Sequence, residues 1–291
     1  MESVLGLDLT LSTTALYSSW IFVRQLGLLL DAGDGVSVSL LQRSQAVRTV
    51  ALTHADRDHI GGLLQFLQLN GRGGLPRIVY PKDADDIREL AEFAARFDRG
   101  ASDRVTWTPI GSGDEVRLGR HWSLVGMATA HWTDAPPGRF PTMGWRVHSH
   151  LLHEDLLVYT GDTPPAPPGT WGAPRLLIHE STYLDVGLAR RKARERHNTH
   201  SALADALDAA MDAQPEALVL THFSIRYSRR QIRDAIQREA AARGATFPIW
   251  AAFPGEVTYD LFRTKPVWEG LLPSRMTESA QLAASEPSEP T

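Results

Sequence analysis

Residues 53–59 read Thr-His-Ala-Asp-Arg-Asp-His and place two imidazoles and two carboxylates within six positions. The preceding Val50-Ala51-Leu52 is typical of the end of a buried strand, and the apolar segment 60–64 is typical of the start of a helix. The cluster therefore lies at a strand-to-helix turn, where the backbone can direct several side chains toward one point. Four metal-ligand side chains so close together are unfavourable unless cations neutralise them, so the stretch predicts a metal site.

Each member of this cluster has a simpler explanation when it is taken alone. Asp56 or Asp58 could cap the helix that follows, and an isolated His54 or His59 would mean little. Four potential ligands in six positions are harder to explain in this way. A metal site nevertheless needs further ligands from elsewhere in the chain.

The composition limits which ligands are available. The chain has 291 residues, of which 43 % are hydrophobic, and it contains no Cys and 11 His. Disulfides, iron–sulfur clusters and cysteine-type zinc sites are therefore excluded, and any metal must be held by His and carboxylates. The net charge of −4 argues against a surface that coats nucleic acid generally, although it permits a local basic patch.

The two ends of the chain predict its surroundings. Residues 1–8 lack a basic region ahead of an apolar run, and no stretch is long and apolar enough to span a membrane. We therefore expect a soluble cytoplasmic protein that makes no membrane contact. Residues 271–291 are rich in Ser, Pro, Ala and Glu and predict a disordered tail, while residues 1–270 predict one domain.

Hydrophobic patterns along the chain predict an α/β fold. Strands are predicted at 4–9, 15–23, 26–30, 47–52, 77–80, 105–108, 122–130, 143–147, 156–159, 176–178 and 217–220, with further strands closing the domain. Helices are predicted at 60–69, 83–97, 201–211 and 229–242. Mixed strands and helices without a clear linker favour an αββα sandwich, in which two mixed sheets pack face to face with helices outside.

Three more potential ligands follow predicted strands. His131 ends the run from Leu124, Asp162 follows Leu157-Val158-Tyr159-Thr160-Gly161, and His222 follows Leu218-Val219-Leu220-Thr221. Any one of them alone would be unremarkable on a protein surface. Together with the cluster they give seven candidates, enough for two five- or six-coordinate ions.

These motifs resemble the metallo-β-lactamase-fold hydrolases, and within them the ribonuclease Z family of endonucleases that trim tRNA 3′ ends. The family loop His-x-His-x-Asp-His is similar to residues 54–59, and an earlier Asp-Cys-Gly-Glu-Gly segment resembles Asp31-Ala32-Gly33-Asp34-Gly35. Further family motifs are similar to His131, Asp162, His179-Glu180-Ser181-Thr182, His200-Ser201-Ala202 and Leu220-Thr221-His222-Phe223-Ser224. The matches follow the family's order from about residue 26 to residue 227.

The resemblance implies a role for each residue. One divalent ion would be held by His54, Asp56 and His131, a second by Asp58, His59 and His222, and Asp162 would bridge them. Zinc is the expected ion and manganese the alternative. Asp58, Glu180 and His200 would act in catalysis, with Glu180 and His200 helping to protonate the leaving oxygen. His197 also resembles the His200 motif, but the spacing to His222 favours His200.

The sequence also departs from the family. Asp56 stands where ribonuclease Z has a second His, which adds negative charge and favours harder ions such as manganese. The 31 positions from His131 to Asp162 leave no room for the arm that grips tRNA in many members. Thr10-Leu11-Ser12-Thr13-Thr14 replaces the family's early Gly-rich loop. Catalytic residues are thus kept while the tRNA grips are missing.

Three functions from different classes stay open at this point. The first is a dinuclear metal-dependent phosphodiesterase or endoribonuclease, acting on a tRNA precursor or a small phosphodiester, with a homodimer implied by the resemblance. The second is a hydrolase of another small ester, a lactone or a thioester, and the third is a non-catalytic metal-binding protein. Basic runs at 190–196 and 226–233 could bind nucleic acid or form solvated helix faces.

Overall fold

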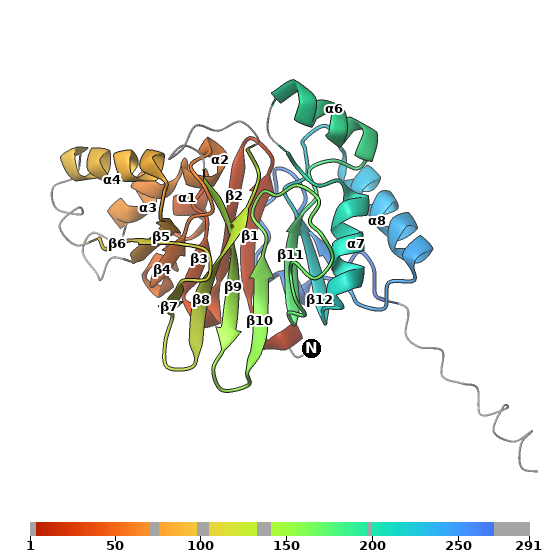
Figure 1. The fold of residues 1–291 in the computed structure, drawn as a ribbon, viewed down its shortest axis with the longest axis horizontal. Coiled ribbons are helices and arrows are strands. Elements are labelled where there is room, and N and C mark those ends of the chain that lie inside the picture. Colours follow the sequence, from red (N-terminus) through yellow and green to blue (C-terminus); the bar gives the residue numbers. More distant parts are fainter. Residues whose placement is uncertain (1–3, 70–75, 98–104, 133–140, 197–198, 271–291) are drawn as a thin grey trace, which may run out of the picture.

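The computed structural model describes residues 4–69, 76–97, 105–132, 141–196 and 199–270. Within these ranges the chain forms two mixed sheets, each built from one continuous part of the sequence (Figure 1). The first sheet has its strands in chain order, with β1–β3 antiparallel and β3–β6 parallel. Its strands are β1 (Leu9–Thr14), β2 (Ser18–Val23), β3 (Leu28–Leu30), β4 (Thr49–Ala51), β5 (Arg77–Pro81) and β6 (Trp107–Ile110).

The second sheet also keeps chain order. Its strands β7–β10 are antiparallel and β10–β13 are parallel. They are β7 (Glu115–Arg117), β8 (Trp122–Thr129), β9 (Thr142–Ser149), β10 (Glu154–Tyr159), β11 (Leu176–Glu180), β12 (Ala217–Thr221) and β13 (Ile249–Ala251). Because β8, β10 and β12 run in the same direction, their carboxyl ends meet at one edge of the molecule.

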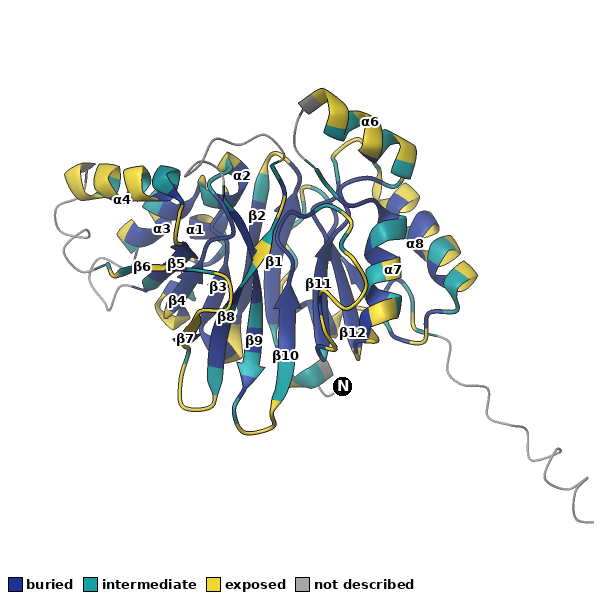
Figure 2. Ribbon diagram, viewed as in Figure 1, coloured by how far each residue is buried: buried dark blue, intermediate teal, exposed yellow. Residues whose placement is uncertain are grey.

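The two sheets pack face to face and helices cover their outer faces. The central core joins residues such as Leu11 and Ile21 of the first sheet to Trp145 and Val219 of the second. Helices α1 (Val36–Ser39), α2 (Arg57–Ile60), α3 (Leu63–Leu69) and α4 (Asp85–Phe97) lie on the side of the first sheet, and α6 (Val186–Arg196), α7 (Leu203–Ala213) and α8 (Arg229–Arg243) on the side of the second. Figure 2 shows the strands largely buried and the outer helix faces exposed. The predicted αββα sandwich is confirmed.

Some predicted elements differ from the structure. The strand predicted at 4–9 is wrong for its first half, because Leu5 and Gly6 have φ of 60° and 67°, and Val4–Gly6 forms a 3-10 helix. The strand begins at Leu9 instead. The helix predicted from residue 60 begins at Arg57 and divides into α2 and α3 at Gly61-Gly62. Neither β7 nor α6 was predicted, since β7 is short and polar and α6 has few apolar residues.

Two predictions, about the tail and about the number of domains, are not tested by the structure. The tail predicted for 271–291 lies outside the described residues, and the assignment of 1–270 to one domain stays a prediction. Across the ranges given above, no helix combines the length and the apolar character that a membrane crossing requires.

Candidate metal centre

The loop between β4 and α2 has the predicted strand-to-helix geometry. Asp56 occupies the N-cap position of α2, but its side chain makes no capping hydrogen bond. Its Oδ2 instead lies 3.5 Å from His54 Nε2 and 3.7 Å from His131 Nε2. Helix capping therefore does not explain the Asp56 carboxylate, which faces two imidazoles from different parts of the chain.

The structure brings all seven predicted ligands together in two groups. His54, Asp56 and His131 form one group and Asp58, His59 and His222 form another, each with its ligand atoms within 4.8 Å of one another. Asp162 lies between the groups. Its Oδ2 is 3.8 Å from His54 Nε2 and 3.4 Å from His59 Nε2, and its Oδ1 is 3.5 Å from His222 Nδ1.

The imidazoles are oriented for ligation. The Nδ1 atoms of His54, His59 and His131 lie 2.7–2.8 Å from Thr53 Oγ1, Asp31 Oδ2 and the Thr199 carbonyl oxygen, respectively. Their Nε2 atoms are buried and have no hydrogen-bond partner among the described residues. Buried nitrogens without a partner are unfavourable, and divalent ions bound by the two groups would satisfy all three. The residues present thus fit divalent metal ions.

His222 enters the site from a strained backbone. Its φ is 59°, a left-handed conformation that costs about 1–3 kcal/mol for a residue other than glycine. Its backbone N–H donates to Thr13 Oγ1 at 3.0 Å, and its Nδ1 lies 2.9 Å from Thr182 Oγ1. Thr13 belongs to the segment that replaces the family's Gly-rich loop, so this segment supports the metal centre from β1.

Asp31 is a functional residue to which the sequence reasoning gave no role. Besides contacting His59, it accepts hydrogen bonds from the Thr53 backbone N–H at 2.7 Å and the Tyr159 hydroxyl at 2.9 Å. The sequence signal that could have revealed this role is the family-like segment that contains Asp31 and Gly33. A Cβ on Gly33 would lie 2.1 Å from the Asp58 carbonyl oxygen, so only glycine allows the ligand loop to approach this closely.

Charges within the cluster compensate each other. Burial acts against the ionised form of Asp162, but His222 and His59 hold its pKa well below the usual range. In the same way, His59 and His222 outweigh burial and lower the pKa of Asp58 to about 2. Burial is also outweighed at His59, whose pKa Asp162 raises well above the usual value. Imidazoles that hold protons next to ionised carboxylates would release them when a metal ion binds.

A second pair lies beside the two groups. His200 Nδ1 is 3.1 Å from Glu180 Oε1. Glu180 ends β11, is buried, and accepts hydrogen bonds from the Thr163 N–H at 2.7 Å and the Thr182 hydroxyl at 2.6 Å. Burial raises the pKa of Glu180, but the charge and hydrogen bond of His200 outweigh it and lower that pKa. The structure thus pairs His200 with Glu180, whereas His197 lies outside the described residues.

The two sheets and the carboxylate–imidazole groups at their edge define the class of the protein, which is a metal-dependent hydrolase. A family model described as the beta-lactamase superfamily domain matches residues 28–223. Ribonuclease Z of Pyrobaculum arsenaticum is 32 % identical over 242 residues, which cover 74 % of this chain and 81 % of that protein. Ribonuclease Z of Halobacterium salinarum is 29 % identical over 301 residues, which cover 86 % of this chain and 94 % of that protein.

Solved structures show the same fold. The crystal structure of the short form of human tRNase Z superimposes with a TM-score of 0.64 at 20 % identity, covering 87 % of this chain and 99 % of that one. The chain belongs to the ribonuclease Z family of the beta-lactamase superfamily. The resemblance seen in the sequence motifs is confirmed.

Proposed function

We propose that this chain is a dinuclear metal-dependent endoribonuclease that removes the 3′ extension of tRNA precursors. The observation that carries the proposal is that two donor groups share Asp162 and lie next to the Glu180–His200 pair. The relatives named ribonuclease Z support the same substrate class.

Each residue has a definite role in this proposal. His54, Asp56 and His131 would hold one ion, Asp58, His59 and His222 the other, and Asp162 both. The bound ions would supply an activated water and neutralise charge on the phosphoryl oxygens. Asp58, which is ionised, would accept a proton from the attacking water. Glu180 would orient His200, which would give a proton to the leaving oxygen.

The proposal is tested with purified, metal-loaded protein. Elemental analysis should give about two metal equivalents per chain, and the protein should cleave both a 3′-extended tRNA precursor and bis(p-nitrophenyl) phosphate. Hydrolysis of the small ester alone would remove tRNA processing but keep the phosphodiester chemistry. Two metal equivalents without turnover of any phosphoester would favour a non-catalytic metal-binding protein. Turnover of a lactone or thioester alone would favour a hydrolase of that kind of substrate.

Zinc is the ion we propose. Manganese is the alternative, because Asp56 replaces a neutral nitrogen by an anionic oxygen, which harder ions prefer. Asp56→His should restore the nitrogen and lower the ratio of manganese-supported to zinc-supported activity by about tenfold. The measurement is the activity of each variant after loading with one metal, together with its metal content. Unchanged metal content and unchanged activity with both ions would show that this interpretation of Asp56 is wrong.

We also propose a homodimer, which an exposed apolar surface supports. Val38 is 79 % exposed, Leu41 60 % and Tyr17 57 %. Hydrogen bonds hold the segments that carry these residues together. The Ser18 hydroxyl donates to the Asp34 carbonyl oxygen at 2.7 Å, and the Tyr259 hydroxyl donates to the Ser39 carbonyl oxygen at 3.4 Å. Exposed apolar side chains that gather in one area are typical of protein interfaces.

Light scattering should therefore give twice the mass of one chain. A Val38→Asp, Leu41→Asp variant should shift the protein to the monomer, because association would bury two carboxylates. Leu151→Asp is the matched control, since Leu151 is 67 % exposed and lies on the hairpin between β9 and β10. A monomeric wild-type protein would contradict the proposal.

A further inference from the structure

Helix α6 presents a strongly basic outer face. It carries five cationic residues and one carboxylate between Val186 and Arg196. Its inner face packs through Ala189 against Tyr183 and Ala202. Glu195 lies 3.9 Å from Arg191 and 2.5 Å from Lys192, whereas Arg190 and Arg194 are exposed and form no ion pair within the described part of the chain.

The spacing of these two arginines is unfavourable unless an anion is near. Arg190 and Arg194 are one helical turn apart, and like charges at this spacing destabilise a helix by a few tenths of a kcal/mol. The helix has only a small apolar contact to offset this repulsion. A polyanion that lies along the outer face would turn the repulsion into attraction.

Helix α6 is directly connected to the proposed catalytic pair. The Tyr183 ring, on which Ala189 packs, lies with its centroid 6.2 Å from that of His200. The guanidinium carbon of Arg226 lies 5.6 Å from the centroid of the same ring, and Arg226 Nε donates to Ser224 Oγ at 3.0 Å. In Figure 1, α6 stands at the edge of the molecule where β10 and β11 end. The Tyr183 ring therefore links His200 both to Arg226 and to the inner face of α6.

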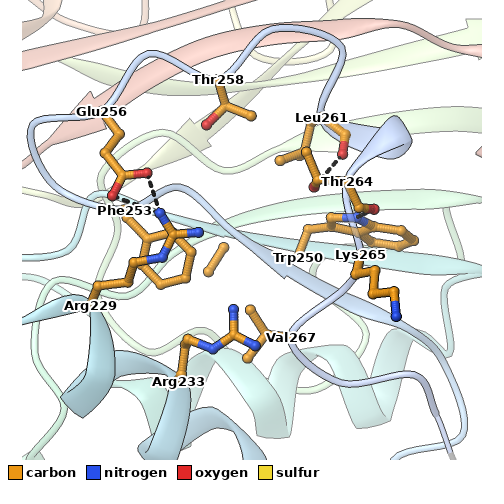
Figure 3. Close-up of a pocket in the computed structure, with 11 residues that line it drawn as sticks. Arg229, Arg233, Trp250, Phe253, Glu256, Thr258, Leu261, Thr264, Lys265 and Val267 are labelled. Atoms are coloured by element: carbon orange, nitrogen blue, oxygen red, sulfur yellow. Dashed lines mark hydrogen bonds and ion pairs between the residues drawn. The ribbon is translucent and has the colours of Figure 1, made fainter.

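The other basic run, residues 226–233, is less suited to bind a polyanion, apart from Arg226. Arg229 is paired with Glu256 at 2.7 Å, and Arg230 lies 3.5 Å from Asp234. Arg233 lines a separate pocket of about 190 Å³, together with Arg229 and Lys265 (Figure 3). Two of these three arginines are thus neutralised within the protein.

We propose that Arg190, Arg194 and Arg226, here called the α6 arginine surface, bind the phosphate backbone of the RNA substrate beside the cleaved bond. This inference rests on the proposed function, because it takes RNA as the substrate. Three exposed guanidinium groups supply the positive charge that a phosphate backbone attracts, and phosphate contacts position a nucleic acid without reading its sequence.

The experiment compares an Arg190→Gln, Arg194→Gln variant with the wild-type holoenzyme. At about 0.1 M salt, KM for a 3′-extended tRNA precursor should rise about tenfold while kcat changes little. The slope of log Kd against log salt for mature tRNA, which has no extension to cleave, should fall by about two. Activity on bis(p-nitrophenyl) phosphate should stay at the wild-type level, because this ester is too small to reach α6.

Three controls make the result specific. Arg190→Lys with Arg194→Lys keeps the charge and should restore KM. Arg238→Gln, which removes an exposed arginine paired with Glu239 on α8, should leave KM unchanged. Arg233→Gln tests the pocket of Figure 3 instead. An unchanged KM and salt slope in the α6 variant would overturn the inference, and a change in the Arg233 variant alone would move RNA binding to the pocket.

The two proposals fail in different ways. If the wild-type protein cleaves no RNA, the proposed function fails, while the affinity for mature tRNA still tests the α6 arginine surface. If the protein cleaves the precursor and the α6 variant binds tRNA normally, only the further inference fails.

Discussion

Asp162→Asn should remove both metal equivalents and lower phosphodiesterase activity about 1,000-fold or more. Asparagine has the same shape but no charge, and Asp162 is the carboxylate that contacts both donor groups. The imidazoles around it would keep their positions but lose the anion that balances them, and the loss of several kcal/mol of transition-state stabilisation corresponds to this factor. The measurements are metal content by elemental analysis and the rate on bis(p-nitrophenyl) phosphate.

Asp155→Asn is the matched control, since Asp155 lies on β10, the strand that precedes Asp162. Asp155 is mostly buried and pairs with His148 at 2.9 Å and Arg146 at 3.2 Å, but it belongs to neither donor group. Its variant should keep both ions and full activity. Retention of two ions in Asp162→Asn would show that Asp162 does not link the groups.

Glu180→Gln should lower kcat by a factor of about 100 to 10,000 without loss of metal, because the proposed function assigns Glu180 to neither ion. Glutamine can still accept a hydrogen bond from the Thr163 N–H, so the local structure should hold. It lacks the negative charge that Glu180 places beside His200 Nδ1. The measurement is kcat on the tRNA precursor, with metal content determined on the same preparation.

A double variant sharpens this test. If Glu180 acts through His200, then His200→Ala added to Glu180→Gln should lower activity little beyond His200→Ala alone. Independent, additive losses would mean that the two residues do not act as a pair. Full activity of Glu180→Gln would instead favour a hydrolase whose substrate needs no such acid.

The residues that the sequence predicted as ligands were accessible to pattern reasoning because each one follows a strand. His131, Asp162 and His222 follow shortly after the ends of β8 (Thr129), β10 (Tyr159) and β12 (Thr221), and strands that run in one direction end at one edge. The layered fold followed from the same alternation of apolar strands and helices. Their proximity in space is confirmed, while their assignment to particular ions stays a prediction.

The supporting residues could not be predicted in this way. Thr53, Thr182 and Tyr159 are ordinary strand or turn residues in the sequence. Neighbouring strand ends bring the hydroxyls of Thr53 and Thr182 to Asp31 and His222, and the packing of the two sheets brings the Tyr159 hydroxyl to Asp31. Helix α6 was missed for a different reason. Its only buried apolar residue is Ala189, so its sequence carries no hydrophobic period that would reveal a helix.

The order of the strands also constrains how this protein is made. Each sheet comes from one continuous part of the chain, with neighbouring strands adjacent in sequence. The first sheet can therefore begin to form during synthesis before the strands of the second are made. Residues 54–59 belong to the part that forms the first sheet, whereas His131, Asp162 and His222 belong to the part that forms the second. The full ligand set is therefore assembled only when the two sheets dock, and an ion that needs the whole set would bind after docking.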